Sequence, residues 1–436
     1  MVTDKKLYIE TYGCQMNFSD SEVVASILAD TYSITKDMQQ ADLVLINTCS
    51  IRENAEIRVF NKLREIQHLR KKNPSVKIGL IGCMARRLKE KIFNQGFKVD
   101  LVLGPDSYRE ISKYVAATEK EDNIINTALS EEETYDNIVP LHFHSNGVSA
   151  FISIMRGCEN FCSYCVVPYT RGKERSRNPE TIFREAEELF NNGYKEITLL
   201  GQNVNSYNWK DYQFPQLLNE LARAKPEMRF RFATSHPKDL SDTLIDSIKN
   251  NTNICRSIHL PVQSGSDAIL KRMNRKYNRE WYLNRVNAIK TQIPESSLST
   301  DIISGFCGET EEDHQKTLSL MEEIGYYYAF MFKYSDRPGT YAHKKYKDDV
   351  PEEIKTRRLQ EIIALQQNLS LQSNKEDIGK SYEVLIEGFS KRSDKYLFGR
   401  NSQNKVVIFP AEKGLKKGDF VVKKVIRCTA ASLFGE

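Results

Sequence analysis

The sequence predicts an α/β protein in three parts: an N-terminal parallel α/β domain, a central partial (β/α)6 TIM-like barrel, and a small C-terminal antiparallel β-barrel of the OB type. Apolar runs alternate with helical patterns over residues 1–120 and again over 144–374, which is typical of parallel sheets. Residues 377–436 carry short strand patterns separated by Gly- and Lys-rich turns, which favours a small barrel. A chain of 436 residues has room for about three such domains.

The first part contains four strand patterns, LYIETYGC, ADLVLINTCS, VKIGLIGCMA and VDLVLG. A helical pattern follows each of the first three, so we expect the strands to lie parallel in one sheet. The next stretch, residues 121–143, is polar and acidic and shows no periodicity. We therefore expect a linker there.

Residues 144–374 contain six strand patterns: AFISIMRG, EITLLGQ, RFRFATS, RSIHLPVQ, LSTDIISGF and AFMFKYS. A helical pattern follows each except the last, and six such units fit an open, partial barrel better than a closed eight-fold one. A long charged helix over residues 351–374 leads out of it. The patterns SYEVLIEGFS, KYLFGRN, KVVIFP and DFVVKKVIRCTA then predict the short strands of the last barrel.

The basic charge of the chain is concentrated in its last part. The whole sequence has 63 Lys and Arg against 58 Asp and Glu, a net charge of +5. Residues 380–436 alone hold twelve basic and six acidic residues, a net charge of +6, which leaves −1 for the rest. Such a segment is typical of a module that binds a polyanion, and a solvated basic surface is the alternative.

Apolar runs in the sequence fall short of the ~18–20 residues that cross a bilayer. The N-terminal segment MVTDKKLYIETYGC is charged from the start, unlike a signal peptide. We therefore expect a cytoplasmic protein with no membrane partner. Nine cysteines in such a protein favour metal binding or catalysis over disulfides.

Three cysteines, Cys158, Cys162 and Cys165, form a C-x3-C-x2-C motif directly after the first barrel strand; we call them the central triplet. Iron–sulfur clusters usually take four cysteine ligands, so three thiolates leave one iron open to a substrate. The loop also falls at the C-terminal face of the barrel, where such folds place their chemistry. A zinc site completed by His142 or His144 is the alternative, although the spacing matches no common zinc module.

Three further cysteines, Cys14, Cys49 and Cys83, are 35 and 34 residues apart, and each lies at the end of a strand pattern; we call them the outlying triplet. The carboxyl ends of parallel strands share one edge of a sheet, so these thiols are expected to converge there as a second three-cysteine site. Three buried structural cysteines are the alternative.

The segment RGCENFCSYCVVPYTRGKERSR, with an aromatic residue before its last cysteine, resembles the signature of the radical S-adenosylmethionine (radical-SAM) superfamily. YGCQMN, NTCSIRENA and GCMA resemble the N-terminal domain of the methylthiotransferase family of these enzymes. The similarity continues through LPVQSGSDAILKRMNRKY, STDIISGFCGETEED, FKYSDRPGTYA and GRNSQNKVVIF. YGCQMN and GQNVNSY are similar to the branch that acts on N6-isopentenyladenosine at position 37 of tRNA, beside the anticodon.

The resemblance implies two 4Fe–4S clusters, one on the central triplet and an auxiliary one on the outlying triplet. It also implies two uses of SAM. One molecule donates a methyl group to a sulfur on the auxiliary cluster. The other is cleaved to a 5′-deoxyadenosyl radical, which abstracts hydrogen from C2 of the adenine before that carbon takes the methylthio group.

The implied partners are the anticodon stem-loop of a tRNA, an external electron donor, and a source of sulfur or cluster repair. Alternatives are the same chemistry on threonylcarbamoyladenosine in tRNA or on a ribosomal protein. From other classes, the alternatives are a two-cluster electron carrier and an RNA-binding scaffold with structural clusters. Cys307 stands where the family usually has Pro, and we expect Cys255, Cys307 and Cys428 to be core or incidental residues.

Polar and aromatic residues of the cysteine loop and the strand ends are candidates to contact SAM or the adenine: Tyr164, Arg177, Gly201, Gln202, Ser235, His236, Gln263 and Asp301. Each can equally orient a ligand from outside the site. Arg171 and Arg175 are further candidates for the SAM carboxylate or an RNA phosphate, with a solvated basic loop as the alternative.

The last part resembles a TRAM domain, which is an RNA-binding module in this family. Its candidate contacts interleave aromatic rings that stack on bases with cations that meet phosphates: Lys391, Arg392, Lys395, Tyr396, Phe398 and Arg400. The resemblance thus divides the chain into an N-terminal methylthiotransferase domain (1–120), a linker (121–143), a radical-SAM core (144–374) and a TRAM domain (377–436).

Overall fold

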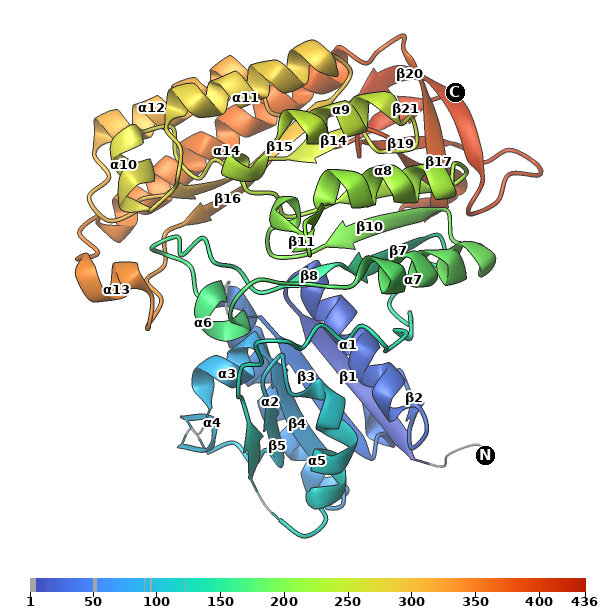
Figure 1. Ribbon diagram of the computed structural model, residues 1–436, viewed down its shortest axis with the longest axis vertical. Helices are drawn as coiled ribbons and strands as arrows, with labels where there is room; N and C mark the ends of the chain where they lie inside the picture. The colour runs from blue at the N-terminus through green and yellow to red at the C-terminus, as the bar shows by residue number, and fades with distance from the viewer. Residues whose placement is uncertain (1–4, 50–52, 90, 95, 122) are drawn as a thin grey trace. The chain divides into compact units, whose positions relative to one another are not determined.

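Figure 1 shows the computed structural model, which describes residues 5–49, 53–89, 91–94, 96–121 and 123–436. The chain forms two compact units. The first contains residues 1–144, 153–159 and 165–182, and the second contains residues 145–152, 160–164 and 183–436. The division runs through the central triplet, because Cys158 and Cys165 belong to the first unit and Cys162 to the second.

The first unit is built on a parallel sheet with the strand order β2-β1-β3-β4-β5-β6. The central strands β3 and β4 are buried almost throughout, as expected where helices cover both faces. The predicted parallel α/β domain is confirmed. Its elements are β1 (Lys6–Tyr12), α1 (Gln15–Leu28), β2 (Ser33–Ile34), β3 (Leu43–Thr48), α2 (Glu53–Lys72), β4 (Lys77–Gly82), α3 (Cys83–Leu88), α4 (Lys91–Asn94), β5 (Leu101–Leu103), α5 (Ile111–Ala117) and β6 (Ile124–Asn126).

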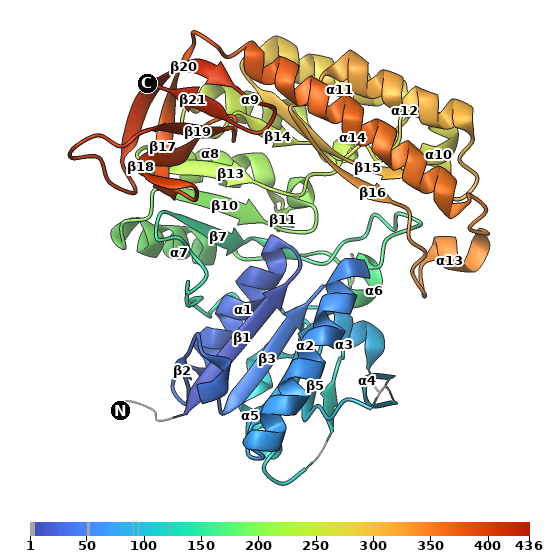
Figure 2. The same cartoon turned by 180° about the vertical axis from the view of Figure 1, so that it is seen from behind.

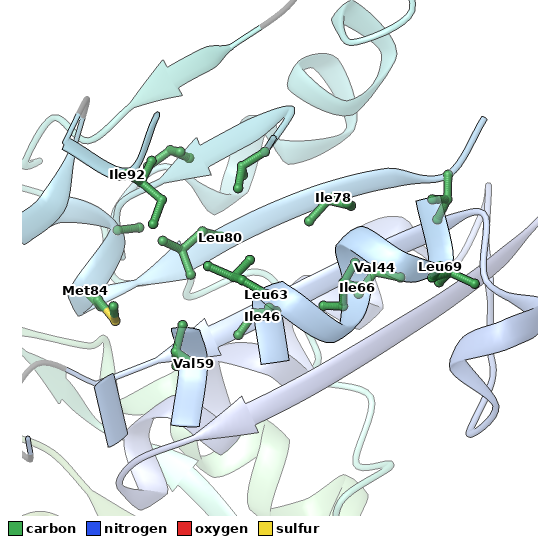
Figure 3. Close-up of a cluster of buried hydrophobic side chains, with 14 of the residues drawn as sticks. Val44, Ile46, Val59, Leu63, Ile66, Leu69, Ile78, Leu80, Met84 and Ile92 are labelled. Atoms are coloured by element: carbon green, nitrogen blue, oxygen red, sulfur yellow. The ribbon is translucent and has the colours of Figure 1, made fainter. Parts of the chain in front are cut away.

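Two apolar cores cover the two faces of this sheet, with α1 and α5 on one face and α2 on the other (Figures 1 and 2). On the α2 side, Val59, Leu63 and Ile66 recur at helical spacing and pack with Ile46 and Leu80 of the central strands (Figure 3). Burying each such side chain stabilises the fold by about 1.5–3 kcal/mol. These cores hold the strands, and therefore the strand ends, in a fixed register.

The segment 121–143, expected to be a linker, is packed onto the first unit. Its residues Ile124–Asn126 form β6, which pairs in parallel with β5. Tyr135 is buried, and its hydroxyl donates to the carbonyl of Pro105 over 2.8 Å. A three-residue strand and isolated anchors leave no periodicity in the sequence, which is why the composition predicted a linker.

The barrel strands follow one another in chain order as two three-stranded sheets, β7-β10-β13 and β14-β15-β16. An isolated parallel bridge joins Phe230 of β13 to Ile254, three residues before β14. All six strands overlap the predicted patterns, so the partial (β/α)6 TIM-like barrel is confirmed. The strands are β7 (Ser149–Ser153), β10 (Glu196–Leu200), β13 (Arg229–Phe232), β14 (Ser257–His259), β15 (Ser297–Ser304) and β16 (Tyr328–Lys333).

Helix starts in the barrel follow local capping chemistry. Thr310 and Asp313 form a capping box at α12, and the side chains of Ser241 and Asn278 accept from backbone N–H groups at α9 and α11. The predicted charged helix is α14. The helices are α7 (Pro179–Asn191), α8 (Phe214–Ala224), α9 (Asp242–Asn250), α10 (Asp267–Arg272), α11 (Arg279–Gln292), α12 (Glu311–Ile324), α13 (Tyr341–Lys345) and α14 (Glu352–Lys375), with the short strands β11 (Asn208–Trp209) and β12 (Tyr212–Gln213) before α8.

Between β7 and α7 the chain returns to the first unit. There it forms β8 (Met155–Arg156), α6 (Val167–Arg171) and β9 (Arg175–Ser176), and β8 pairs antiparallel with β9. The longest described helices, α2 and α14, have 20 and 24 residues. None of the helices in the described part of the chain combines the length and the apolar character needed to cross a membrane.

The C-terminal strands close into a barrel with the order β17-β18-β19-β21-β20 around a core that includes Val384, Leu397 and Phe409. The small barrel is thus confirmed, although the short strand β21 was not predicted. Three residues next to the end of the chain are too few for an alternating pattern to show. The strands are β17 (Ser381–Ser390), β18 (Ser393–Asn401), β19 (Val406–Pro410), β20 (Phe420–Cys428) and β21 (Leu433–Gly435).

Within the second unit, this small barrel is joined to the N-terminal ends of the larger barrel's strands. Arg231 at β13 donates to Glu196 over 2.8 Å and to the carbonyls of Asn401 and Ser402 over 2.7 and 3.2 Å. Ser297 at the start of β15 donates to the carbonyl of Gln403 over 2.6 Å. Because buried charges and backbone carbonyls satisfy each other here, these contacts join the two barrels within the second unit.

Candidate metal centres

Three adjacent strands of the first unit end at the outlying triplet. The last residues of β1, β3 and β4 are paired with one another, so the three strands end level. Cys49 follows β3 directly, Cys83 opens α3 directly after β4, and Cys14 is the N-cap of α1 just beyond β1. The structure thus places all three thiols at one edge of the sheet, as the strand pattern predicts.

Two glycines make this approach possible. Gly13 has a φ of +132°, and a Cβ added there would lie 2.5 Å from the Cβ of Cys49. Gly82 has a φ of +96°, and its added Cβ would lie 2.5 Å from Oδ1 of Asn47. Only glycine combines these backbone angles with so little space. The glycine before each of Cys14 and Cys83 therefore has a steric cause.

Buried amides support the same edge. Asn17 donates from Nδ2 to Oδ1 of Asn47 over 2.9 Å, and Asn47 donates to the Asn17 carbonyl over 2.8 Å and to Ser21 over 2.9 Å. The Cys14 thiol donates to Oδ1 of Asn17 over 3.3 Å. Sequence reasoning did not assign a role to either asparagine. The available signal was an amide close to each cysteine, in YGCQMN and INTC.

Arg171 brings a positive charge to the outlying triplet. Its Nε donates to the sulfur of Cys83 over 3.2 Å. The hydrogen bond from Cys49 lowers the pKa of Cys14 to about 6, with help from the Arg171 charge and against the effect of burial. Burial raises the pKa of Cys83, and Arg171 opposes that rise. A thiol that ionises near neutral pH is poised to bind a metal, because the thiolate is the ligand.

The outlying triplet fits an iron–sulfur cluster. Thiolates are the ligands such clusters use, and hydrogen bonds to cluster sulfurs are a usual part of their surroundings. Here a guanidinium already contacts one sulfur, and its Nη1 has no hydrogen-bond partner among the described residues. The histidines considered for a zinc site have other partners: His142 Nδ1 lies 2.9 Å from Glu22, and His144 Nε2 lies 3.4 Å from Thr11.

In the first unit, the loop of the central triplet is anchored at Gly157. This residue has a φ of +81°, and an added Cβ would overlap the carbonyl oxygen of Lys173. The backbone N–H of Cys158 donates to the carbonyl of Gly172 over 3.1 Å. Because two segments of backbone meet here, no side chain fits at position 157.

In the second unit, Cys162 is held by Arg275. The guanidinium donates from Nη1 to the cysteine sulfur over 3.1 Å, and from Nη2 to the Pro261 carbonyl and from Nε to the Tyr277 hydroxyl over 2.8 Å each. The N–H of the next residue, Ser163, donates to the Met273 carbonyl over 3.0 Å. Sequence reasoning did not single out Arg275, since it lies 113 residues from Cys162.

Beyond the C-terminal ends of β10 and β13 lie buried polar atoms that have no hydrogen-bond partner among the described residues. They are Oγ of Ser235, Nε2 of His236 and both amide atoms of Asn205. Burial, together with the charge of Arg275, lowers the pKa of His236 to about 2, so the ring is neutral. Burying polar groups without partners is unfavourable, so these atoms fit a ligand that brings its own donors and acceptors.

Gln263 and Asp301 lie side by side. The N–H of Gln263 donates to the Asp301 carbonyl over 2.9 Å, and Gln263 has a φ of +74°. The Asp301 carboxylate lies 3.5 Å from Nε2 of His259, whose ring meets the ring of Phe330 edge-on at 5.8 Å. Tyr328 and Phe330 are 46% and 41% exposed, so this sheet presents an open aromatic and acidic surface.

The remaining SAM candidates of the barrel differ in their surroundings. Tyr164 packs edge-on against Phe306 at 6.4 Å, and its hydroxyl lies 3.5 Å from Nη1 of Arg275. Gly201 and Gln202 follow β10 directly; Gly201 is buried and Gln202 is partly exposed. Their contact with SAM stays a prediction.

The arginines after the central triplet are not free to meet an anion outside the first unit. Arg171 pairs with Asp20 at 2.7 Å and Arg175 with Asp106 at 2.9 Å. Arg177 is buried, and its guanidinium donates to the Thr181 hydroxyl over 3.0 Å. These contacts argue against the expected roles on a SAM carboxylate or an RNA phosphate. The aspartates lie 151 and 69 residues from their partners, so local sequence did not reveal them.

Most of the predicted RNA contacts gather on the β17–β18 hairpin. Lys391, Arg392, Lys395 and Tyr396 are exposed there, and sequence reasoning missed the neighbouring aromatic Phe389, which is 61% exposed. The two remaining candidates are more enclosed. Phe398 is partly buried, and Arg400 donates to both carboxylate oxygens of Glu387 over 2.8 and 2.7 Å.

Three family models match the chain in succession. The model described as "Uncharacterized protein family UPF0004" matches residues 6–104, the radical SAM superfamily matches residues 152–321, and the TRAM domain matches residues 375–436. They cover the parallel sheet, most of the larger barrel and the small barrel respectively.

Among solved structures, the radical S-adenosylmethionine methyltransferase TsrM from Kitasatospora setae superposes with a TM-score of 0.59 at 14% identity, covering 78% of this chain and 77% of that one. The cobalamin-dependent S-adenosylmethionine radical enzyme OxsB gives a TM-score of 0.55 at 12% identity, covering 83% and 56%. At such low identity, the similarity concerns the fold.

Full-length relatives are much closer in sequence. The protein of Parabacteroides distasonis named tRNA-2-methylthio-N(6)-dimethylallyladenosine synthase is 54% identical over 438 residues, which cover 99% of this chain and 95% of that protein. The protein of the same name from Bacteroides thetaiotaomicron is 55% identical over 440 residues, covering 99% and 96%. The chain therefore belongs to the tRNA-2-methylthio-N(6)-dimethylallyladenosine synthase family, within the radical SAM superfamily.

Proposed function

We propose that this chain is a radical-SAM methylthiotransferase that adds a methylthio group to C2 of N6-isopentenyladenosine at position 37 of tRNA, with two SAM molecules consumed per product. The names of its full-length relatives support the substrate. The single structural observation that carries the proposal is the outlying triplet, whose three cysteines share one sheet edge, with a buried guanidinium against one of their sulfurs. In this proposal the second site holds the sulfur that is inserted.

The two triplets hold two 4Fe–4S clusters in this proposal. When bound, the central cluster supplies the electron that cleaves SAM, and the auxiliary cluster carries the sulfur. The chain's own residues orient the ligands. Arg275 holds the sulfur of Cys162, and Arg171 holds that of Cys83.

SAM and the target adenine are held by the polar atoms at the ends of the barrel strands. Ser235, His236 and Asn205 offer unpaired hydrogen-bonding atoms that suit the amine, the carboxylate or the base. Because Nδ1 of the neutral His236 ring accepts from the N–H of Lys238, the proton is on Nε2, which can donate to a ligand.

The aromatic surface formed by Tyr328 and Phe330 supports N6-isopentenyladenosine as the substrate. Exposed rings suit the flat adenine and its apolar dimethylallyl group. The alternative, threonylcarbamoyladenosine, carries a carboxylate that would meet the carboxylate of Asp301 on the same sheet, because Asp301 pairs with Phe330. Like charges at short range disfavour that substrate.

The reaction also requires partners outside the chain. Each cleavage of SAM consumes one electron, so an external one-electron donor must supply it. Each product removes one sulfur atom, so a sulfur donor or a cluster-repair system must replace it. The TRAM domain, rich in exposed cations, binds the anticodon stem-loop. Its tRNA substrate places the enzyme in the cytoplasm.

Analysis of tRNA nucleosides tests this function. A deletion strain should lack 2-methylthio-N6-isopentenyladenosine and accumulate N6-isopentenyladenosine. The intact gene should restore the product, and so should Cys428→Ala, which changes a cysteine of the small barrel. Cys83→Ala should not. Loss of the methylthio form of threonylcarbamoyladenosine instead, or of a modification on a ribosomal protein, would show that the substrate is wrong.

A further inference from the structure

Five buried charged side chains contact one another in the first unit, next to Cys83. Arg171 pairs with Asp20 at 2.7 Å, and Asp20 pairs with Arg156 at 2.8 Å. Arg156 approaches Asp106 at 3.9 Å, and Asp106 pairs with Arg175 at 2.9 Å. The Asp20 side chain is fully buried, and those of Arg156 and Arg171 are 3% exposed. Five charged groups thus lie out of contact with water.

The positive and negative charges of these five residues do not balance. Three guanidinium groups face two carboxylates, which leaves one positive charge in excess among the described residues. A buried charge without a counter-ion is strongly unfavourable. Arg171 lies at one end of this series of five charged residues, and it also contacts the sulfur of Cys83. The excess charge is therefore directed to the outlying triplet, where the bound thiolates and their cluster supply negative charge.

The hydrogen bonds of Arg171 show one unused position. A guanidinium has five N–H donors. Its Nε donates to the Cys83 sulfur over 3.2 Å, and its Nη2 donates to Asp20 over 2.7 Å. Its Nη1 is buried and has no acceptor among the described residues. An N–H left unpaired away from water is costly, so a buried Nη1 marks a place where a ligand accepts a hydrogen bond.

We propose that Arg171 is a positioning residue for the sulfur that the outlying triplet delivers: its Nε fixes the Cys83 sulfur, and its unpaired Nη1 donates to the anionic sulfur carried at that centre. The inference rests on the proposed function, which puts an auxiliary cluster on Cys14, Cys49 and Cys83. Arg171 is the last residue of α6, six positions after Cys165. The segment that carries a ligand of the central cluster therefore also carries the donor that orients sulfur at the auxiliary one.

The test uses full-length protein with the central triplet changed to Ala, so that only the auxiliary cluster remains. In this background, Arg171→Gln and Arg171→Lys are compared with the unchanged arginine. The measurements are iron content, the midpoint potential from an anaerobic redox titration, and the dissociation constants for sodium sulfide and methanethiol followed by electron paramagnetic resonance. Lys173→Gln is the matched control, because it removes a cation from the same segment at a 66% exposed position.

With iron retained, Arg171→Gln should lower the midpoint potential and weaken sulfide and methanethiol binding at least tenfold. Arg171→Lys should lie between Gln and Arg, since it keeps the charge but not the fork of donors. Lys173→Gln should match the parent. Unchanged potential and affinity in an iron-replete Arg171→Gln protein would overturn the inference, and so would loss of iron from both variants, which would show a role in assembly alone. Absence of iron from the parent itself would instead refute the proposed auxiliary cluster.

Discussion

Arg275 donates from Nη1 to the sulfur of Cys162 over 3.1 Å, and both side chains are buried. The same relationship recurs at the other triplet, where Arg171 contacts the sulfur of Cys83 over 3.2 Å. Each set of three cysteines therefore has one sulfur held by a buried cation. Such a contact stabilises the thiolate and fixes its direction, as the two clusters of the proposed function require.

Replacing Arg275 by Gln should slow SAM cleavage at least tenfold. The change removes the charge beside Cys162, and removing each charged hydrogen bond should destabilise the fold by about 1.5–3 kcal/mol. The measurement is 5′-deoxyadenosine formed with dithionite, normalised to bound iron. Lys276→Gln, at the exposed neighbouring position, should cleave SAM as the parent does. An iron-replete Arg275→Gln protein with the parent's rate would contradict this role.

Changing the central or the outlying triplet to Ala should impair different steps of the reaction. Removing the central triplet should leave about half of the iron and sulfide with a cubane spectrum, and should abolish SAM cleavage, because the proposed function gives each set of three thiolates its own cluster. Removing the outlying triplet should abolish the methylthio product but leave some SAM cleavage. The measurements are metal analysis and product chromatography on anaerobic protein. Stoichiometric zinc in the native protein, or loss of cleavage from a folded variant of the outlying triplet, would refute this division.

Gly157→Ala should disrupt the central site far more than Gly193→Ala. Both glycines have a positive φ, +81° and +84°, so both substitutions cost about 1–2 kcal/mol of backbone strain. Only at Gly157 does the added methyl meet backbone, whereas nothing lies within 4 Å of a Cβ at Gly193. The variants are compared by urea unfolding and iron content. Equal iron content and equal stability of the two variants would show that the loop at Gly157 accommodates the methyl group without a loss of stability.

His236 should make the fold less stable as the pH falls below its usual pKa of 6.5. In the folded protein its pKa is about 2, so the folded ring stays neutral while the unfolded chain takes up a proton. The stability from this group is complete above pH 6.5 and decreases by about 1.4 kcal/mol for each pH unit below it. His236→Asn keeps an acceptor for the N–H of Lys238 and should remove this part of the slope. Urea unfolding between pH 5 and 7.5 measures it; identical slopes would refute burial of a neutral ring.

The exposed cations of the β17–β18 hairpin should carry the salt dependence of tRNA binding. Changing Lys391, Arg392 and Lys395 to Gln should flatten the slope of log affinity against log salt by roughly 0.7–0.9 for each RNA phosphate that the variant no longer neutralises. The control, with Lys413, Lys416 and Lys417 changed to Gln, removes as much charge from exposed positions of another turn in the same barrel. Equal effects of the two sets would indicate attraction by net charge rather than a defined contact.

Point variants are preferable to removal of residues 377–436. The small barrel supplies the carbonyls that accept from Arg231, and it pairs with Arg229 through Glu383 at 3.1 Å. Truncation would remove these carbonyl acceptors of Arg231 and the Glu383 partner of Arg229, and leave both buried arginines to Glu196 alone, which would weaken the larger barrel as well. A loss of tRNA binding after truncation would therefore not identify the RNA contact.

Features that depend only on residues close together in the sequence were determined by the sequence alone. The alternation of strand and helix patterns predicted both parallel sheets, because hydrophobic periodicity reflects how each segment buries one face. The position of Cys14, Cys49 and Cys83 at successive strand ends predicted their common edge, since parallel strands place their carboxyl ends together. The cysteine spacing of the central motif and the strand patterns of the small barrel are local in the same sense.

Only the tertiary structure decided which charged groups are free and which are paired. Arg171 and Arg175 looked available for an anion because they follow a basic loop, yet they are buried against Asp20 and Asp106, which come from 151 and 69 residues away. Arg400, whose contact with RNA stays a prediction, is paired with Glu387 across β17 and β18. Coulomb attraction acts through space, and the distance between two charges is set by how the elements pack, which no local pattern in the sequence records.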